Sequence, residues 1–93
     1  MIVGVLRVDL AVFEAQSLKD RRRVIKSLKE RLAARFNVSV AEVGASDSPK
    51  KAMLGMAVVG NESRFVQSCL DKIVDYVRRD PGASLIDYEQ ELF

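Results

Sequence analysis

Residues 2–13 read IVGVLRVDLAVF, and an apolar residue or glycine occupies every second position from Ile2 to Val12. The intervening positions carry Arg7 and Asp9 among small and apolar residues. A period of two with many β-branched residues is typical of a strand with one fully buried face. We therefore predict a strand over residues 2–13. The other face of this strand is mixed. It carries Arg7 and Asp9, which can pair, so we do not expect this face to form a second apolar core.

A helix is predicted after this strand, with Ser17 as its N-cap and Asp20 three residues further on. At 100° per residue the apolar side chains fall within a sector about 80° wide. They are Leu18, Ile25, Leu28, Leu32 and Phe36. Asn37 is expected to end the helix in the left-handed conformation.

The sequence after this helix predicts two strands, a second helix and a last strand. The strands cover residues 38–43 and 52–59, with a turn-rich loop over residues 44–51. Asn61 is expected to cap the second helix, in which Cys69 is a core residue, and Asp80-Pro81-Gly82 to end it. An alternating strand follows over residues 83–93. The order β-α-β-β-α-β predicts an α+β, ferredoxin-like sandwich with antiparallel sheet order 4-1-3-2 and both helices on one face. We expect residues 1–93 to form a single domain.

Composition excludes several classes of function. The 93 residues include no histidine and one cysteine, Cys69. Cys/His zinc sites and His-based catalysis are therefore excluded, and we expect no enzyme, no metal, no cofactor and no small-molecule substrate. Asp87, Glu89 and Glu91 alternate along the last strand and span about 13 Å, too far for one ion. The sequence contains no apolar run of about 18 residues, so we expect no membrane span. A single cysteine cannot form an internal disulfide, and we expect the protein in the cytoplasm.

The first helix carries most of the positive charge. Between Ser17 and Phe36 there are eight basic and two acidic residues, a net +6 in a chain of net +2. Basic residues on one helical face can bind nucleic-acid phosphates, although a solvated face is the alternative. We predict RNA or ribosome contacts from Lys19, Arg22, Arg23, Lys26 and Lys29, with Lys50 and Lys51 as a second contact or as a charged loop tip.

Arg21 is the exception, because its direction lies in the middle of the apolar sector. It could form an anion site with the Ser17 hydroxyl and the first-turn amides. Alternatively, it could pair with Glu14 or Asp9 as a structural residue.

With both helices on one face of the predicted sheet, the other face is open, and it predicts a second kind of partner. Residues 52–59 contain no aromatic side chain, which argues against base stacking on the sheet as in an RRM domain. A homodimer, or another partner that covers the sheet, is the alternative function, because an aliphatic patch would otherwise be exposed. Its predicted residues are Val3, Val5, Ala57 and Val59.

Three segments carry a resemblance to a known family: residues 17–22 (SLKDRR), 35–43 (RFNVSVAEV) and 54–59 (LGMAVV). In these segments the chain resembles the YlxP-like family of small bacterial proteins, whose function is unknown. The resemblance implies a ferredoxin-like fold in the bacterial cytosol. It also implies a connection to RNA or the ribosome, since the genes often lie beside those of translation initiation and ribosome-maturation factors. Ser46-Asp47-Ser48-Pro49 departs from the acidic and aromatic residues that members often carry in this loop.

Overall fold

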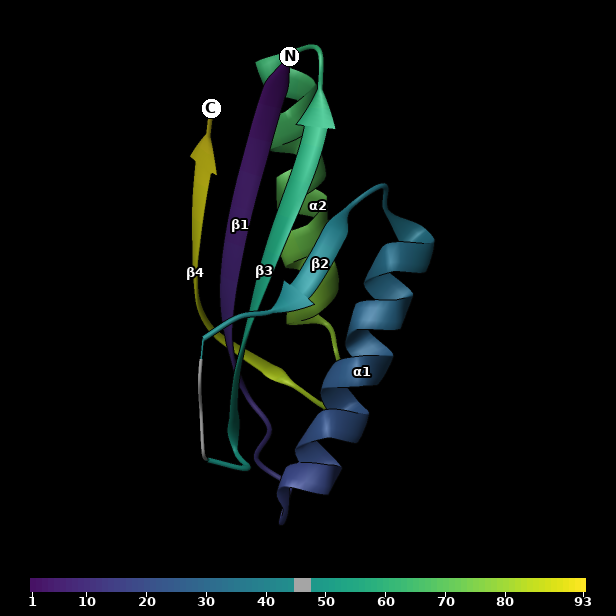
Figure 1. The fold of residues 1–93 in the computed structure, drawn as a ribbon, viewed down its shortest axis with the longest axis vertical. Coiled ribbons are helices and arrows are strands. Elements are labelled where there is room, and N and C mark those ends of the chain that lie inside the picture. Colours follow the sequence, from purple (N-terminus) through teal and green to yellow (C-terminus); the bar gives the residue numbers. More distant parts are fainter. Residues whose placement is uncertain (45–47) are drawn as a thin grey trace.

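The structure, a computed structural model, describes residues 1–44 and 48–93, so the middle of the loop predicted over residues 44–51 lies outside the described residues. Within them, antiparallel strands form one sheet in the order β2-β3-β1-β4, and two helices accompany it (Figure 1). This confirms the predicted ferredoxin-like fold. The elements are β1 (Ile2–Ala11), α1 (Leu18–Arg35), β2 (Ser39–Glu42), β3 (Lys51–Gly60), α2 (Ser63–Arg78) and β4 (Ser84–Leu92).

The core lies on the face of the sheet that both helices share. Leu6 and Val8 of β1 are fully buried, as are Leu28 of α1 and Leu70 of α2. All four belong to one apolar cluster, against which Cys69 also packs while partly buried. The apolar phase of β1 therefore faces the helices as predicted, and the other face of the sheet is open.

Gly4 allows α2 to approach β1 closely. A Cβ atom at this position would lie 2.5 Å from Val66 Cγ1 and 3.0 Å from Leu70 Cδ1. Such distances are shorter than van der Waals contact, so no larger residue fits without moving α2 or the strand.

A β-bulge interrupts the alternation that was predicted for residues 83–93. Asp9 is opposite Asp87, whereas Leu10 is opposite Leu85, so Ile86 is the extra residue of β4. Leu85 packs against the core, and Ile86 is exposed. Beyond the bulge, Asp87, Glu89 and Glu91 all lie opposite open-face positions of β1, and Arg7 Nη1 lies 2.9 Å from Glu89 Oε2.

The helix ends differ in part from prediction. Ser17 caps α1, because its Oγ accepts a hydrogen bond from Asp20 N at 3.1 Å. The left-handed Asn37 is wrong: in the described residues no residue other than glycine has a positive φ. Phe36 is already extended, since the chain must enter β2 three residues later.

Asn61 is not the cap of α2. Glu62 occupies that position and makes no side-chain capping bond. Val66 and Phe65 pack tightly over Gly60, and this contact sets where the helix begins after β3.

The carboxylate of Asp80 joins three elements. Its Oδ1 lies 2.7 Å from Arg31 Nη2 of α1, and its Oδ2 accepts hydrogen bonds from Gly82 N at 2.9 Å and Ala83 N at 2.8 Å. The Asp80 side chain is 1% exposed. The hydrogen bond that Arg31 donates to Asp80 raises the pKa of Arg31 above its ordinary value. The segment predicted only to end α2 thus also fixes α1 to the start of β4.

Candidate nucleic-acid interface

Four of the predicted cations of α1 are exposed, and Lys29 is half-buried. Val24 approaches Gly82, and Arg31 reaches Asp80, so one flank of α1 faces the end of α2 and the start of β4. At 100° per residue the cations of α1 predicted to contact RNA lie on the other flank of the helix. Figure 1 shows α1 at the margin of the molecule, beyond β2. We call this outward flank the basic ridge; it consists of Lys19, Arg22, Arg23, Lys26 and Lys29.

Most of the basic ridge lacks an acidic partner. Lys26 Nζ lies 4.0 Å from Glu30 Oε1, and no ion pair joins the other ridge residues to any of the described residues. By contrast, Arg31 is held by Asp80, and the Arg35 guanidinium lies 5.4 Å from the centre of the Tyr76 ring. The cations of α1 are therefore divided between structural positions and positions on one flank that, apart from Lys26, have no acidic partner among the described residues.

Lys50 has a structural role. Its Nζ donates hydrogen bonds to the carbonyl oxygens of Phe13 at 2.7 Å and Ala15 at 3.0 Å. These bonds tie the loop after β1 to the start of β3. Lys51 is exposed, and its carbonyl oxygen accepts a hydrogen bond from Arg21 Nη1.

Arg21 is buried, with 8% of its surface exposed. Its Nη1 lies 3.2 Å from Glu42 Oε2 and donates a hydrogen bond to Lys51 O at 3.0 Å. Pairing with Glu14 or Asp9 was therefore the wrong expectation; Asp9 pairs with Arg7 instead, at 3.4 Å. The pairing of β2 with β3 brings Glu42 near Arg21, and the sequence carries no local sign of this.

The anion site predicted from Ser17 and Arg21 is not assembled from those two groups. The Ser17 hydroxyl is engaged with Asp20, while Arg21 reaches the end of β2. The Nε of Arg21 is buried and has no hydrogen-bond partner.

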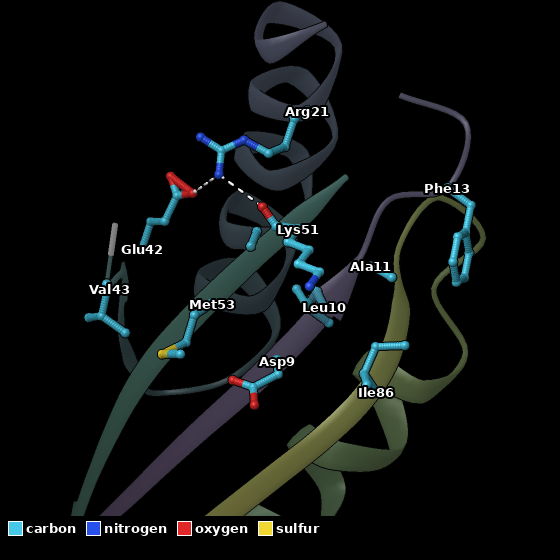
Figure 2. A pocket seen from close by; sticks show the side chains of 12 residues that line it. Asp9, Leu10, Ala11, Phe13, Arg21, Glu42, Val43, Lys51, Met53 and Ile86 are labelled. Carbon is cyan, nitrogen blue, oxygen red and sulfur yellow. Dashed lines mark hydrogen bonds and ion pairs between the residues drawn. The ribbon is translucent and has the colours of Figure 1, made fainter. Parts of the chain in front are cut away.

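A cavity of about 530 Å³ adjoins Arg21 (Figure 2). Side chains from β1, β3 and β4 form its apolar walls, and Arg21 and Glu42 lie at one end. Sequence reasoning missed this cavity, because its lining comes from residues far apart in the chain. They are Asp9, Leu10, Ala11, Phe13, Arg21, Glu42, Val43, Gly44, Lys51, Ala52, Met53 and Ile86.

The predicted dimer face is assembled on the open side of the sheet. Val3 lies opposite Val59, and Val5 lies opposite Ala57. Val5 and Val59 are exposed, while Val3 and Ala57 are half-buried. We call these four residues the aliphatic patch.

Two kinds of site are absent from the described residues. None of their helices combines the length and apolarity needed to cross a membrane. No group of three or more histidine, cysteine, aspartate or glutamate side chains in residues 1–44 and 48–93 is arranged to hold a metal ion.

Designed proteins are among the solved structures with a similar fold. The chain matches the designed protein Foldit4 with a TM-score of 0.54 and 14% identity, covering 100% of this chain and 97% of that one. It matches a designed protein with ferredoxin fold, LFR1 1, with a TM-score of 0.53 and 14% identity over 99% of this chain and 85% of the other. These similarities support the fold.

Sequence comparison identifies the family. The uncharacterized protein YlxP of Bacillus subtilis is 26% identical over 80 residues, which cover 86% of this chain and 87% of YlxP. Residues 3–90 match the model of a protein family of unknown function, DUF503. Since the match spans nearly the whole chain, the protein belongs to the DUF503 family, as its resemblance to YlxP-like proteins implied.

Proposed function

We propose that the protein is a non-catalytic binding module whose basic ridge contacts the phosphate backbone of RNA. The observation that carries this proposal is the group of exposed cations on one flank of α1, most of them without an acidic partner in the described residues. Such a surface releases counterions when it binds phosphates, and this release favours binding.

The position of these cations supports a binding role over a structural one. Lys19 lies in the first turn of α1, where the helix dipole disfavours positive charge, and Arg22 and Arg23 follow in the second turn. The placement of Lys19 costs a few tenths of a kcal/mol or more. A phosphate partner would turn this cost into a gain.

The ribosome is the narrower form of this proposal. A preference for one ribosomal subunit over a generic structured RNA would support it, and equal affinity would leave a general RNA-binding module. Either partner would be met in the cytoplasm, the location expected from the sequence.

The test neutralises two ridge residues. The double variant Arg22→Gln/Lys26→Gln is expected to weaken binding to a structured RNA about tenfold or more at low salt and to reduce the slope of log K against log salt by about two. Fluorescence anisotropy across a salt series measures both quantities. The matched control is Arg64→Gln/Lys72→Gln, which removes the same charge from exposed positions of α2 and is expected to change binding little.

Equal effects of the two double variants would show that net charge, and not the basic ridge, determines binding. No binding of the unmodified protein at low salt would contradict the proposal outright, because phosphate contacts are strongest there.

A second candidate function is homodimerisation through the aliphatic patch. The patch consists of facing cross-strand pairs, and the charges beside it are already paired: Arg7 lies 2.9 Å from Glu89 and 3.4 Å from Asp9. A second copy of this face could therefore cover it without burying an unpaired charge, which favours a copy over a strongly charged partner.

Under this candidate, Val5→Asp is expected to halve the mass measured by light scattering, because each copy would bring a carboxylate into the apolar interface. Val59→Asp, at a more exposed position, provides a second variant if the first unfolds. Ser68→Asp, which adds the same charge at an exposed position of α2 away from the sheet face, is the control. A monomeric unmodified protein would reject the candidate.

A further inference from the structure

We infer that the cavity beside Arg21 holds an unpaired nucleobase, so that the RNA bound by the basic ridge is single-stranded at this point. The inference rests on the proposed function and narrows it to a class of RNA. Unpaired bases can leave the stack and enter protein pockets, whereas paired bases in an A-form helix cannot.

The cavity and the basic ridge begin at the same turn of α1. Arg21 lines the cavity, and the next two residues, Arg22 and Arg23, are exposed on the ridge. Lys51 also lines the cavity and is exposed. A strand whose phosphates lie along the ridge can therefore present a base to the cavity where it passes the start of α1.

The walls suit the flat, apolar surface of a base. Phe13 is 65% exposed and Ile86 is 61% exposed, and Met53 of β3 lines the cavity on the other side of β1 from Ile86 (Figure 2). An aromatic ring on which a base can stack is the usual anchor for single strands. The volume of about 530 Å³ falls within the range of small-ligand sites.

The polar groups suit the edge of a base. Residues 1–44 and 48–93 contain three buried side-chain polar atoms without a hydrogen bond: Arg21 Nε, Asp9 Oδ1 and Arg7 Nε. The first two belong to residues that line the cavity. Asp9 Oδ1 and Arg7 Nε face each other at 3.4 Å as an ion pair, so of these three atoms Arg21 Nε alone lacks a partner. An unmet buried donor is costly, and an acceptor on the edge of a base that reached Arg21 Nε would satisfy it.

The acceptors also predict which base is preferred. Asp9 and Glu42 supply carboxylates to the cavity, and carboxylates accept from an amine. Cytosine carries an amine where uracil carries a carbonyl oxygen. We therefore expect an oligocytidylate to bind more tightly than an oligouridylate of the same length.

The experiment compares two exposed phenylalanines. Phe13→Ala removes an aromatic wall of the cavity, and Phe65→Ala removes a ring of similar exposure, 58%, which lies outside the cavity lining. Phe13→Ala is expected to weaken binding of a short oligocytidylate about tenfold and to leave binding of an RNA duplex unchanged. Phe65→Ala is expected to change neither. Cytidine monophosphate is expected to shift the methyl NMR signals of Met53 and Ile86.

The failure of this inference is distinguishable from failure of the proposed function. If Arg22→Gln/Lys26→Gln weakens RNA binding while Phe13→Ala and Phe65→Ala act alike, the ridge binds RNA and the cavity holds no base. Equal affinity for cytidylate and uridylate, with no methyl shifts, would also overturn the inference. If the ridge variant has no effect, the proposed function fails first.

Discussion

Replacing Asp80 by alanine is expected to lower the free energy of unfolding by about 3 kcal/mol. The carboxylate is 1% exposed and accepts hydrogen bonds from Arg31, Gly82 N and Ala83 N. Alanine leaves the two backbone donors and the guanidinium without their acceptor. Arg31 is 41% exposed and can recover water, which keeps the loss near the lower end of the values for broken buried pairs.

Chemical denaturation measures this effect, and a thermal midpoint about 15 °C lower would accompany it. Asp75→Ala is the control, since it removes an exposed carboxylate from α2 at no cost to the contact between α1 and β4. If both variants lose the same small amount of stability, Asp80 does not join these elements in solution.

Gly4→Val is expected to lower the free energy of unfolding by about 3 kcal/mol, near the upper end of overpacking penalties. The Cβ alone would lie 2.5 Å from Val66 Cγ1, and the two further methyl groups must displace α2. Valine otherwise favours strands, so a loss of stability would demonstrate the close contact between β1 and α2.

Ala57→Val is the matched control for strand propensity. Ala57 lies on β3 opposite Val5, half-buried on the open face of the sheet, where added methyl groups meet no helix. We expect it to be neutral or slightly stabilising. A Gly4→Val protein as stable as this control, by the same denaturation measurement, would show that α2 does not approach β1 as described.

The fold could be predicted because its signals are local. The alternation around Leu6 and Val8 and the apolar sector of α1 each depend on residues within two turns or one strand, and they fix which face is buried. The errors occur where contacts between residues far apart in the sequence determine the local structure. The bulge at Ile86 depends on pairing with β1, and the start of α2 depends on packing over Gly60.

The candidate site follows the same division. The basic ridge could be predicted from a helical projection, because all of its members lie on one helix. The partner of Arg21 could not, since Glu42 follows it by 21 residues and arrives through the pairing of β2 with β3. The cavity escaped prediction for the same reason: its walls come from three strands and include Ile86, the extra residue of the bulge in β4.

The positions of α1 and β4 make the molecule an electric dipole across its sheet. Positive charge gathers on α1 at one margin, while β4 at the other carries Asp87, Glu89 and Glu91 and no basic residue (Figure 1). In the field of a polyanion such a body experiences a torque as well as an attraction. It therefore turns α1 toward the polyanion before contact, and the encounter rate should fall with ionic strength more steeply than a net charge of +2 would produce.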